Sequence, residues 1–374
     1  MLKAYKFRIY PTKAQITVME RTLDLCRWTY NQTLAYRKNL YEQEGKSSSK
    51  YATNALLPTW KEEKPELNEV FSQVLQNVQE RVDLALKAFF RRVKAGEEPG
   101  YPRFKGQGWY KSFTYPDSET GYKLQGSKLT LSKIGSIRIF KHREVEGKIK
   151  TCTIKKDNLG HWYAILVSEI EDVPQIEPKT AIGVDVGLKN MVALSDGTTL
   201  DYPRYYVQAQ KKLAVVQRNL SRRKKGSSNR QVAKIKVARL HQRIENLRNE
   251  FLHQVSRKIV DCADLIVFEN LNIKGMLKNH HLAKHIQDHA WGKLIQFTQS
   301  KAEKAGKVVE LVDARYTSQK CSQCGIIVPK TLADRNHLCP NCGLEMDRDI
   351  NASVNIRTLG LRGRACREIG EPSL

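Results

Sequence analysis

The spacing of apolar residues predicts one short strand and then two helices in the first quarter of the chain. Residues 3–9 alternate polar and apolar positions as an edge strand does, and Pro11 ends the alternation. From Thr12, a favourable N-cap, apolar residues recur at a helical period along residues 12–45. A second helical pattern covers residues 67–93, and its expected inward face contains Phe71, Val74, Leu75, Val78, Val82, Leu86, Phe89 and Phe90.

A change in pattern after Gly96 predicts a small antiparallel barrel or sheet. Glycine, proline and aromatic residues interrupt regular structure up to about residue 116. Alternating runs follow at residues 124–131, 135–140, 149–156 and 162–170, with a turn at 157–160. Because the strand at residues 3–9 needs a partner, we expect it to join this sheet, with the two helices as an insertion.

A third pattern begins after the linker at residues 173–179. Residues 181–187 and 263–270 are short apolar runs typical of buried strands, and a hairpin is expected at residues 191–200. Between them, residues 211–258 have the pattern of a long amphipathic helix pair, joined by a loop at residues 221–230. The segment after Asn355 is polar and glycine-rich, and we expect it not to pack.

Composition points to a polyanionic partner. The 374 residues carry a formal net charge of +25, which favours binding to nucleic acid over a neutral metabolic role. An anionic membrane is the weaker alternative, because no apolar run reaches the roughly 18 residues of a spanning helix and the start lacks a signal-peptide core. The unpaired pattern of Cys26, Cys152, Cys262 and Cys366 fits a reducing compartment.

Four further cysteines have the spacing of a zinc ribbon. Two Cys-x-x-Cys knuckles, each followed by glycine, are separated by 14 residues, and each knuckle directs two thiolates at one ion. With four protein ligands the zinc would be structural. A rubredoxin-like iron site or unrelated free thiols remain alternatives. The predicted ligands are Cys321, Cys324, Cys339 and Cys342.

Three acidic residues are candidates for a magnesium-dependent catalytic site. Asp185 lies within a predicted buried strand, Glu269 ends a second one, and Asp349 opens a helix. A buried carboxylate without a cation is costly, and three carboxylates suit two divalent ions that act on a phosphodiester. Two simpler interpretations remain open, in which Asp349 is only a helix cap and Glu269 only faces solvent.

Other residues are candidates for nucleic-acid contacts. Residues 211–258 contain fifteen Lys or Arg against two Glu, so we expect sequence-independent backbone contacts there. Polar side chains on the second helix and beside the aromatic segment could read a DNA motif. His281, His285 and His289 recur every four residues, and we favour a lid beside Glu269 over a metal site. The candidates for nucleic-acid contact are Gln73, Gln76, Asn77, Arg103, Lys105, Thr114, Arg222, Arg223, Lys224, Lys225 and Arg230.

Several of these segments together resemble the TnpB family of insertion-sequence-encoded proteins, relatives of the type V CRISPR effectors. The resemblance covers nearly the whole chain, and the family's three acids fall on Asp185, Glu269 and Asp349. One departure is Ser353, where the family pattern has alanine, a change between small residues. The segments are LKAYKFRIYPTKAQ, GYPRFKGQGWYKSF, AIGVDVGLKNMVALSDG, LIVFENLNIKGM, YTSQKCSQCG and CGLEMDRDINASVNI.

The resemblance implies a multidomain α/β protein with a RuvC-like, ribonuclease H-type nuclease domain. That domain would span residues 173–374 and contain the zinc ribbon at residues 317–346. A wedge β-barrel (residues 1–10 and 96–172) would precede it, with an inserted helical recognition lobe at residues 11–95.

The implied activity is RNA-guided cleavage of double-stranded DNA next to a short transposon-associated motif. Two Mg²⁺ ions at Asp185, Glu269 and Asp349 and one structural Zn²⁺ would be the cofactors. The guide RNA would derive from the transposon end, and we expect a monomer in the cytoplasm of a prokaryotic cell, near the nucleoid. The alternatives are a catalytically silent RNA-guided DNA-binding regulator and a guide-independent transposase.

Overall fold

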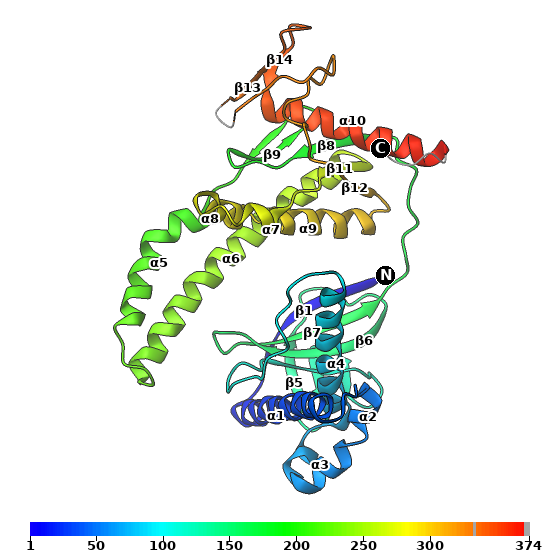
Figure 1. Ribbon diagram of the computed structural model, residues 1–374. Helices are drawn as coiled ribbons and strands as arrows, with labels where there is room; N and C mark the ends of the chain where they lie inside the picture. Colours follow the sequence, from blue (N-terminus) through cyan, green and yellow to red (C-terminus); the bar gives the residue numbers. More distant parts are fainter. Residues whose placement is uncertain (332–333, 370–374) are drawn as a thin grey trace. The chain divides into compact units, whose positions relative to one another are not determined.

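The computed structural model describes residues 1–331 and 334–369, which form two compact units that divide between Glu171 and Asp172 (Figure 1). Within those residues, no helix has the length and apolar character needed to cross a membrane.

The first unit contains a seven-stranded antiparallel sheet. Strand β1 lies between β7 and β5, so the prediction that the first strand joins the later ones is confirmed. Strand β2 was not predicted, because it is hidden in the segment rich in glycine and aromatic residues. In the order β2-β6-β7-β1-β5-β4-β3, the strands are Ser112–Tyr115, Lys148–Lys156, Trp162–Glu169, Leu2–Tyr10, Gly135–Phe140, Lys128–Leu131 and Tyr122–Gln125.

Helices occupy the insertion between β1 and β2. Helix α1 begins after Thr12, whose side chain accepts the N–H of Gln15 while the Gln15 side chain accepts the N–H of Thr12. The second predicted helix is shorter at its start than expected, because Leu67 belongs to a separate 3₁₀ turn, and its Phe90 is 55% exposed rather than inward. The bounds are α1 Lys13–Glu44, α2 Lys50–Asn54, α3 Leu57–Glu63, the 3₁₀ helix Pro65–Glu69 and α4 Ser72–Lys94.

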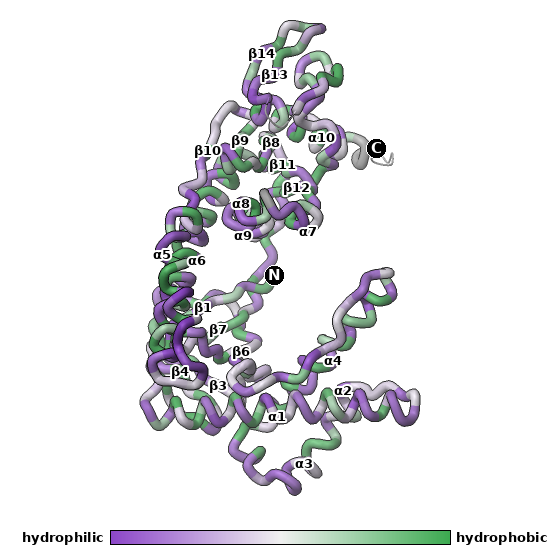
Figure 2. Tube along the Cα trace, turned by 60° about the vertical axis from the view of Figure 1, so that its left-hand side comes forward, coloured by the Kyte–Doolittle hydropathy of each residue, from purple (hydrophilic) through white to green (hydrophobic). Residues whose placement is uncertain are grey.

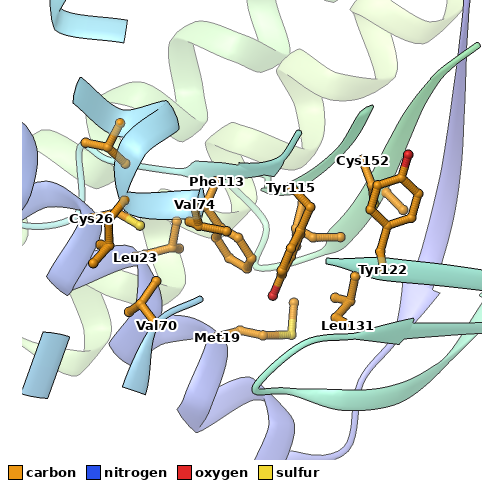
Figure 3. Packing of buried hydrophobic residues seen from close by; sticks show 14 of the residues in the cluster. Met19, Leu23, Cys26, Val70, Val74, Phe113, Tyr115, Tyr122, Leu131 and Cys152 are labelled. Atoms are coloured by element: carbon orange, nitrogen blue, oxygen red, sulfur yellow. The ribbon is translucent and has the colours of Figure 1, made fainter. Parts of the chain in front are cut away.

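One continuous core joins these helices to the sheet. Figure 3 shows side chains from α1, α4 and several strands packed together, including Met19, Val74, Tyr115 and Leu131. All four are at most 1% exposed. The insertion and the sheet therefore stabilise each other through shared apolar burial.

The second unit is built on a five-stranded mixed sheet in the order β10-β9-β8-β11-β12. Strands β8, β11 and β12 are parallel, whereas β9 and β10 run antiparallel to their neighbours. Parallel neighbours require long crossover connections, which here consist of helices. The strands are Thr199–Asp201, Asn190–Leu194, Ala181–Asp185, Leu265–Glu269 and Val308–Val312.

Helices cover both faces of this sheet (Figure 1). Alternate residues of β11 point to opposite faces: Ile266 and Phe268 pack in a cluster with α6, α8 and α9, whereas Leu265 and Val267 pack with Ile356 of α10. Because β11 is buried on both faces, its sequence reads as a continuous apolar run. The bounds are α6 Ser228–Cys262, α7 Ile273–Met276, α8 His280–His289, α9 Trp291–Lys304 and α10 Arg348–Ile369.

The crossover from β10 to β11 is a long helical hairpin made of α5 (Tyr205–Ser221) and α6. The two helices lie side by side and project away from the sheet of their unit, with many hydrophilic positions along them (Figure 2). The predicted helix pair is confirmed, but Leu247 on its expected apolar face is 40% exposed. The sheet covers only the end of the hairpin nearest to it.

The end of helix α10 contradicts the prediction for the segment after Asn355 over residues 356–369, whereas residues 370–374 of that segment lie outside the described residues. Residues 356–369 continue the helix, and Ile356 is fully buried. A Cβ atom at Gly360 would lie 2.4 Å from Val267 Cγ2, so glycine lets the helix pack directly on the sheet. Gly360, one of the glycines that suggested disorder, thus permits close packing.

Candidate functional site

Two of the three predicted acids lie at the same end of neighbouring parallel strands. Strand β8 ends at Asp185 and β11 ends at Glu269, and the register pairs the preceding residues, Val184 and Phe268. The carboxyl ends of parallel strands meet at one edge of a sheet, so these two acids lie next to each other there. Asp185 is 9% exposed and Glu269 is 7% exposed.

Asp349 reaches this edge from the first turn of α10. The side chain of Asp347 caps this helix, because its Oδ1 accepts the N–H groups of Asp349 at 2.8 Å and Ile350 at 3.3 Å. The interpretation of Asp349 as a mere helix cap is therefore wrong. A Cβ atom at Gly187 would lie 3.7 Å from Asp349 Oδ2, which places this carboxylate beside the loop that follows Asp185.

A glycine in β8 allows α10 to come close enough to bring Asp349 to the site. A Cβ atom at Gly183 would lie 1.9 Å from the backbone oxygen of Ser353 and 2.6 Å from the backbone nitrogen of Arg357. Ser353 is fully buried, and its hydroxyl donates to Ile350 O at 2.7 Å. Serine at this position is therefore accommodated without an unsatisfied polar group.

Burial and mutual repulsion make it unfavourable for the three acids to carry their negative charges together. Burial raises the pKa of Asp185 well above its usual range, and the charges of Glu269 and Asp349 raise it further. Burial also raises the pKa of Glu269, against a hydrogen bond from Thr317. Among the described residues, neither acid forms an ion pair; Arg348 instead donates to Asp349 Oδ1 at 3.1 and 3.2 Å.

This chemistry fits divalent cations. Carboxylate oxygens are the ligands that Mg²⁺ prefers, and a buried cluster of acids with too few cationic partners is stabilised when such an ion binds. The interpretation in which Glu269 faces solvent does not hold, because its side chain is buried beside Asp185.

The four predicted cysteines form a second candidate metal site. Their Sγ atoms all lie within 4.8 Å of one another, at 3.6 Å for Cys321–Cys342 and 3.5 Å for Cys324–Cys339. The short strands β13 (Asn336–Leu338) and β14 (Glu345–Asp347) flank the second knuckle. Four converging thiols fit a tetrahedral zinc ion.

The protonation of these thiols also favours a bound cation. The N–H of Ile326 donates to Cys324 and lowers the pKa of that thiol to about 6. The N–H of Leu344 acts on Cys342 in the same way, but burial and hydrogen bonds with the neighbouring thiols outweigh it and raise the pKa of Cys342 to about 12. Thiolates at this spacing would repel one another, and a bound cation would neutralise them.

The predicted motif-reading residues cluster where α4 meets β2. Arg81 joins two of them, because its side chain donates hydrogen bonds both to Thr114 Oγ1 at 2.7 Å and, through Nε, to Asn77 Oδ1 at 3.1 Å. Thr114 is only 9% exposed, Gln73 is half-buried and Gln76 is exposed. Arg81 was missed in the sequence, where nothing distinguishes it from other helix arginines.

The aromatic segment before β2 is a fixed loop. The Asn31 side chain of α1 accepts the N–H of Lys105 at 2.8 Å and donates to its backbone oxygen at 3.0 Å. Arg103 is exposed, and Trp109 is 78% exposed. The loop therefore presents a basic and an aromatic side chain to the surroundings from an anchored backbone.

The cationic side chains of the predicted basic loop in the α5–α6 hairpin fall into two groups, one exposed and one bonded to the backbone of the turn. Four consecutive cationic side chains, Arg222 to Lys225, are exposed at the tip. Arg230 instead donates to the backbone oxygens of Leu220 at 2.9 Å and Arg223 at 2.7 Å, so it holds the turn together.

The histidine series does not form a metal cluster among the side chains that the structure describes, which exclude His281. His289 is 1% exposed, and its Nδ1 lies 2.8 Å from His285 O. Both residues belong to α8, which packs in the core beside β8 and β11.

Three family models match parts of the chain. Residues 164–280 match a model described as "Probable transposase" (OrfB_IS605), residues 291–356 match "Cas12f1-like, TNB domain", and residues 1–46 match "Helix-turn-helix domain". The structure does not contain a helix-turn-helix in this last range, because residues 2–44 form strand β1 and the single helix α1.

Two relatives that match this chain over nearly its full length are both named as RNA-guided DNA endonucleases. A protein of Streptomyces pristinaespiralis named "Putative RNA-guided DNA endonuclease" is 32% identical over 97% of this chain and 90% of its own length. "Putative RNA-guided DNA endonuclease InsQ" of Escherichia coli K12 is 32% identical over 98% and 94%. The structure of the mini-RNA-guided endonuclease CRISPR-Cas_phi3 shares the fold, with a TM-score of 0.53 and 9% identity over 100% of this chain and 93% of that one.

Proposed function

The chain belongs to the TnpB family, and from this premise we propose that it is an RNA-guided endonuclease that cuts double-stranded DNA next to a short transposon-associated motif. The observation that carries this proposal is the convergence of Asp185, Glu269 and Asp349 on one buried edge of the sheet. A protein that only bound nucleic acid would gain nothing from three buried acids that repel one another.

We infer a RuvC-like nuclease domain in residues 173–374, with the zinc ribbon at residues 317–346 inserted between β12 and α10. The wedge domain would consist of residues 1–10 and 96–172, and the recognition lobe of residues 11–95. The strand order of the second sheet and the acids at the ends of β8 and β11 support this assignment.

In the proposed mechanism, Asp185 would contribute to holding both ions, and Glu269 and Asp349 would each contribute to holding one. When bound, two magnesium ions would activate a water molecule and stabilise the leaving oxygen of the phosphodiester. Arg348 fixes Asp349 Oδ1, which leaves Oδ2 available to the site. The apolar strands behind the acids keep water away from their other sides.

A single zinc ion is proposed at Cys321, Cys324, Cys339 and Cys342. Its contribution would be to folding, since the described residues of the ribbon include only two three-residue strands and form little apolar core. No thiol position remains open for catalysis.

For the nucleic acids, we propose two kinds of contact. Arg222, Arg223, Lys224 and Lys225 would bind phosphates without regard to sequence, as would Arg103 and Lys105. The group that contains Gln73, Gln76, Asn77 and Thr114 would read the motif beside the target, with Arg81 orienting two of its members.

The test of the proposed function starts from RNA that copurifies with the protein. We expect a defined RNA species, and magnesium-dependent cutting of a plasmid that carries a sequence matching the variable end of that RNA. Sequencing of the RNA and gel analysis of the plasmid are the measurements. Strand-transfer products formed without RNA would favour a transposase, and occupancy of the matched plasmid without cutting would favour a silent regulator.

Replacing both Arg222 and Arg223 with alanine should weaken nucleic-acid binding equally for all sequences. Each lost phosphate contact should reduce the slope of log affinity against log salt by about 1. Binding titrations at several salt concentrations, with matched and unmatched DNA, provide the measurement. The Arg222→Lys/Arg223→Lys variant keeps the charges and should bind nearly normally. A loss confined to one target sequence would contradict the backbone role.

A further inference from the structure

A threonine outside the three acids contacts the candidate catalytic site. Thr317 lies just before the first cysteine knuckle and is 3% exposed, and its hydroxyl donates to Glu269 Oε1. Ala314 O is a second acceptor within reach, at 3.1 Å. A hydroxyl has one proton, and a hydrogen bond to an ionised carboxylate is the stronger of the two, so Glu269 is the favoured acceptor.

Two asparagines on α10 hold the backbone around Thr317. Asn355 Nδ2 donates to the backbone oxygens of Thr317 at 2.9 Å and Lys320 at 2.7 Å. Asn351 Nδ2 donates to Lys320 O at 2.8 Å, and its Oδ1 accepts the N–H of Ser322 at 3.0 Å. Asn351 is fully buried and Asn355 is 7% exposed.

These contacts connect three parts of the second unit. Asn351 and Asn355 are four residues apart, so they lie on one face of the same helix whose first turn carries Asp349. Lys320 and Ser322 flank the zinc candidate Cys321. Helix α10 therefore both supplies one acid and fastens the first knuckle, while Thr317 links that fastened segment to a second acid.

We propose that Thr317 is a positioning residue for the nuclease site. It holds one oxygen of Glu269 and leaves the other oxygen of that carboxylate for a magnesium ion. Because the first knuckle and Thr317 belong to one clamped segment, this contact would connect the zinc ribbon to the nuclease site. This inference rests on the proposed function for the role of Glu269.

A hydroxyl at this position is better explained by positioning than by packing alone. Valine has nearly the same shape as threonine but has no hydroxyl. It would therefore fill this position while donating a hydrogen bond to neither Glu269 nor Ala314 O. A carboxylate that loses a hydrogen bond but stays buried costs free energy and becomes free to rotate. Groups that hold a metal ligand in this way commonly change metal affinity or activity about 10–100-fold when removed.

The experiment compares Thr317→Val with Thr317→Ser in the full chain bound to its RNA. Binding of Mn²⁺, measured by electron paramagnetic resonance, and the Mg²⁺ dependence of cleavage are the two readouts. We expect Thr317→Val to weaken Mn²⁺ binding about 10-fold or more, with normal binding of RNA and target DNA. Thr317→Ser keeps the donor and should restore both readouts to within about threefold of the original protein. Unchanged Mn²⁺ binding in Thr317→Val would overturn the proposal, and so would equal losses in both variants.

A double-mutant cycle separates positioning from general loss of structure. If Thr317 acts through Glu269, adding Thr317→Val to Glu269→Gln should weaken Mn²⁺ binding no further. An additional loss in the double variant would show that the threonine acts by another route and would refute the proposal. Because this readout does not need cleavage, absence of any guided cutting by the original protein would count against the proposed function and not against the Thr317–Glu269 coupling.

Discussion

Replacing Asp185 with asparagine should abolish guided DNA cleavage while RNA and target binding stay intact. Asparagine keeps the shape but removes the charge that would be shared between two ions. We expect the variant to lose about 4 kcal/mol or more of transition-state stabilisation, which lowers the cleavage rate about 10³-fold or more. Cleavage of a matched plasmid and gel-shift assays of the same complex are the measurements.

The same substitution should raise the melting temperature in the absence of magnesium. Asp185 is buried beside two other acids, so removing its charge removes repulsion that the metal-free fold must otherwise tolerate. Asp201→Asn is the matched control, because Asp201 is exposed on β10 and should change neither cleavage nor melting. Guided cleavage by Asp185→Asn at the normal rate would contradict the assignment of the site.

Replacing Gly183 with alanine should destabilise the second unit and abolish cleavage. The added methyl group would meet the backbone of α10 at 1.9 Å, where no flexible side chain can move aside. Overpacking commonly costs about 1–3 kcal/mol, and the helix that moves away carries Asp349 with it. Thermal melting and plasmid cleavage together measure the effect.

Gly363→Ala provides the control for this substitution. Gly363 lies in the same helix, and a Cβ atom there would meet nothing within 4 Å. Alanine should leave activity intact and raise helix stability slightly, by up to about 1 kcal/mol. Normal melting and cleavage in Gly183→Ala would show that the close contact between β8 and α10 is not required.

Features that depend on local pattern could be predicted from the sequence. An apolar run that contains an acid at 185 and another that ends in an acid at 269 need only local residues to be recognised, although β8 ends at Asp185 and does not continue to residue 187 as expected. The two knuckles identify the thiol cluster by spacing alone. The pairing of β1 with later strands followed from the need of an isolated strand for a partner. These predictions concern which elements exist, and the structure agrees with them.

Features that depend on close packing between distant segments could not be predicted. The glycines at 360 and 363 suggested a segment without structure, whereas Gly360 allows α10 to pack on Val267. The sequence Asp-Arg-Asp at 347–349 does not reveal which of the two aspartates caps the helix, because a carboxylate oxygen of either could accept the N–H groups of the first turn. Thr317 carries no signal of its own, since its role depends on a hydrogen bond across 48 residues.

The position of α10 in the chain has a consequence for the nascent protein. Its acid is translated 164 residues after Asp185, a delay of roughly 8–33 s at the usual speed of about 5–20 residues per second. Until that helix leaves the ribosome, the emerging polypeptide has two of its three acids and an uncovered glycine face on β8. A chain that stops before this helix would lack Asp349 and could not assemble the proposed site.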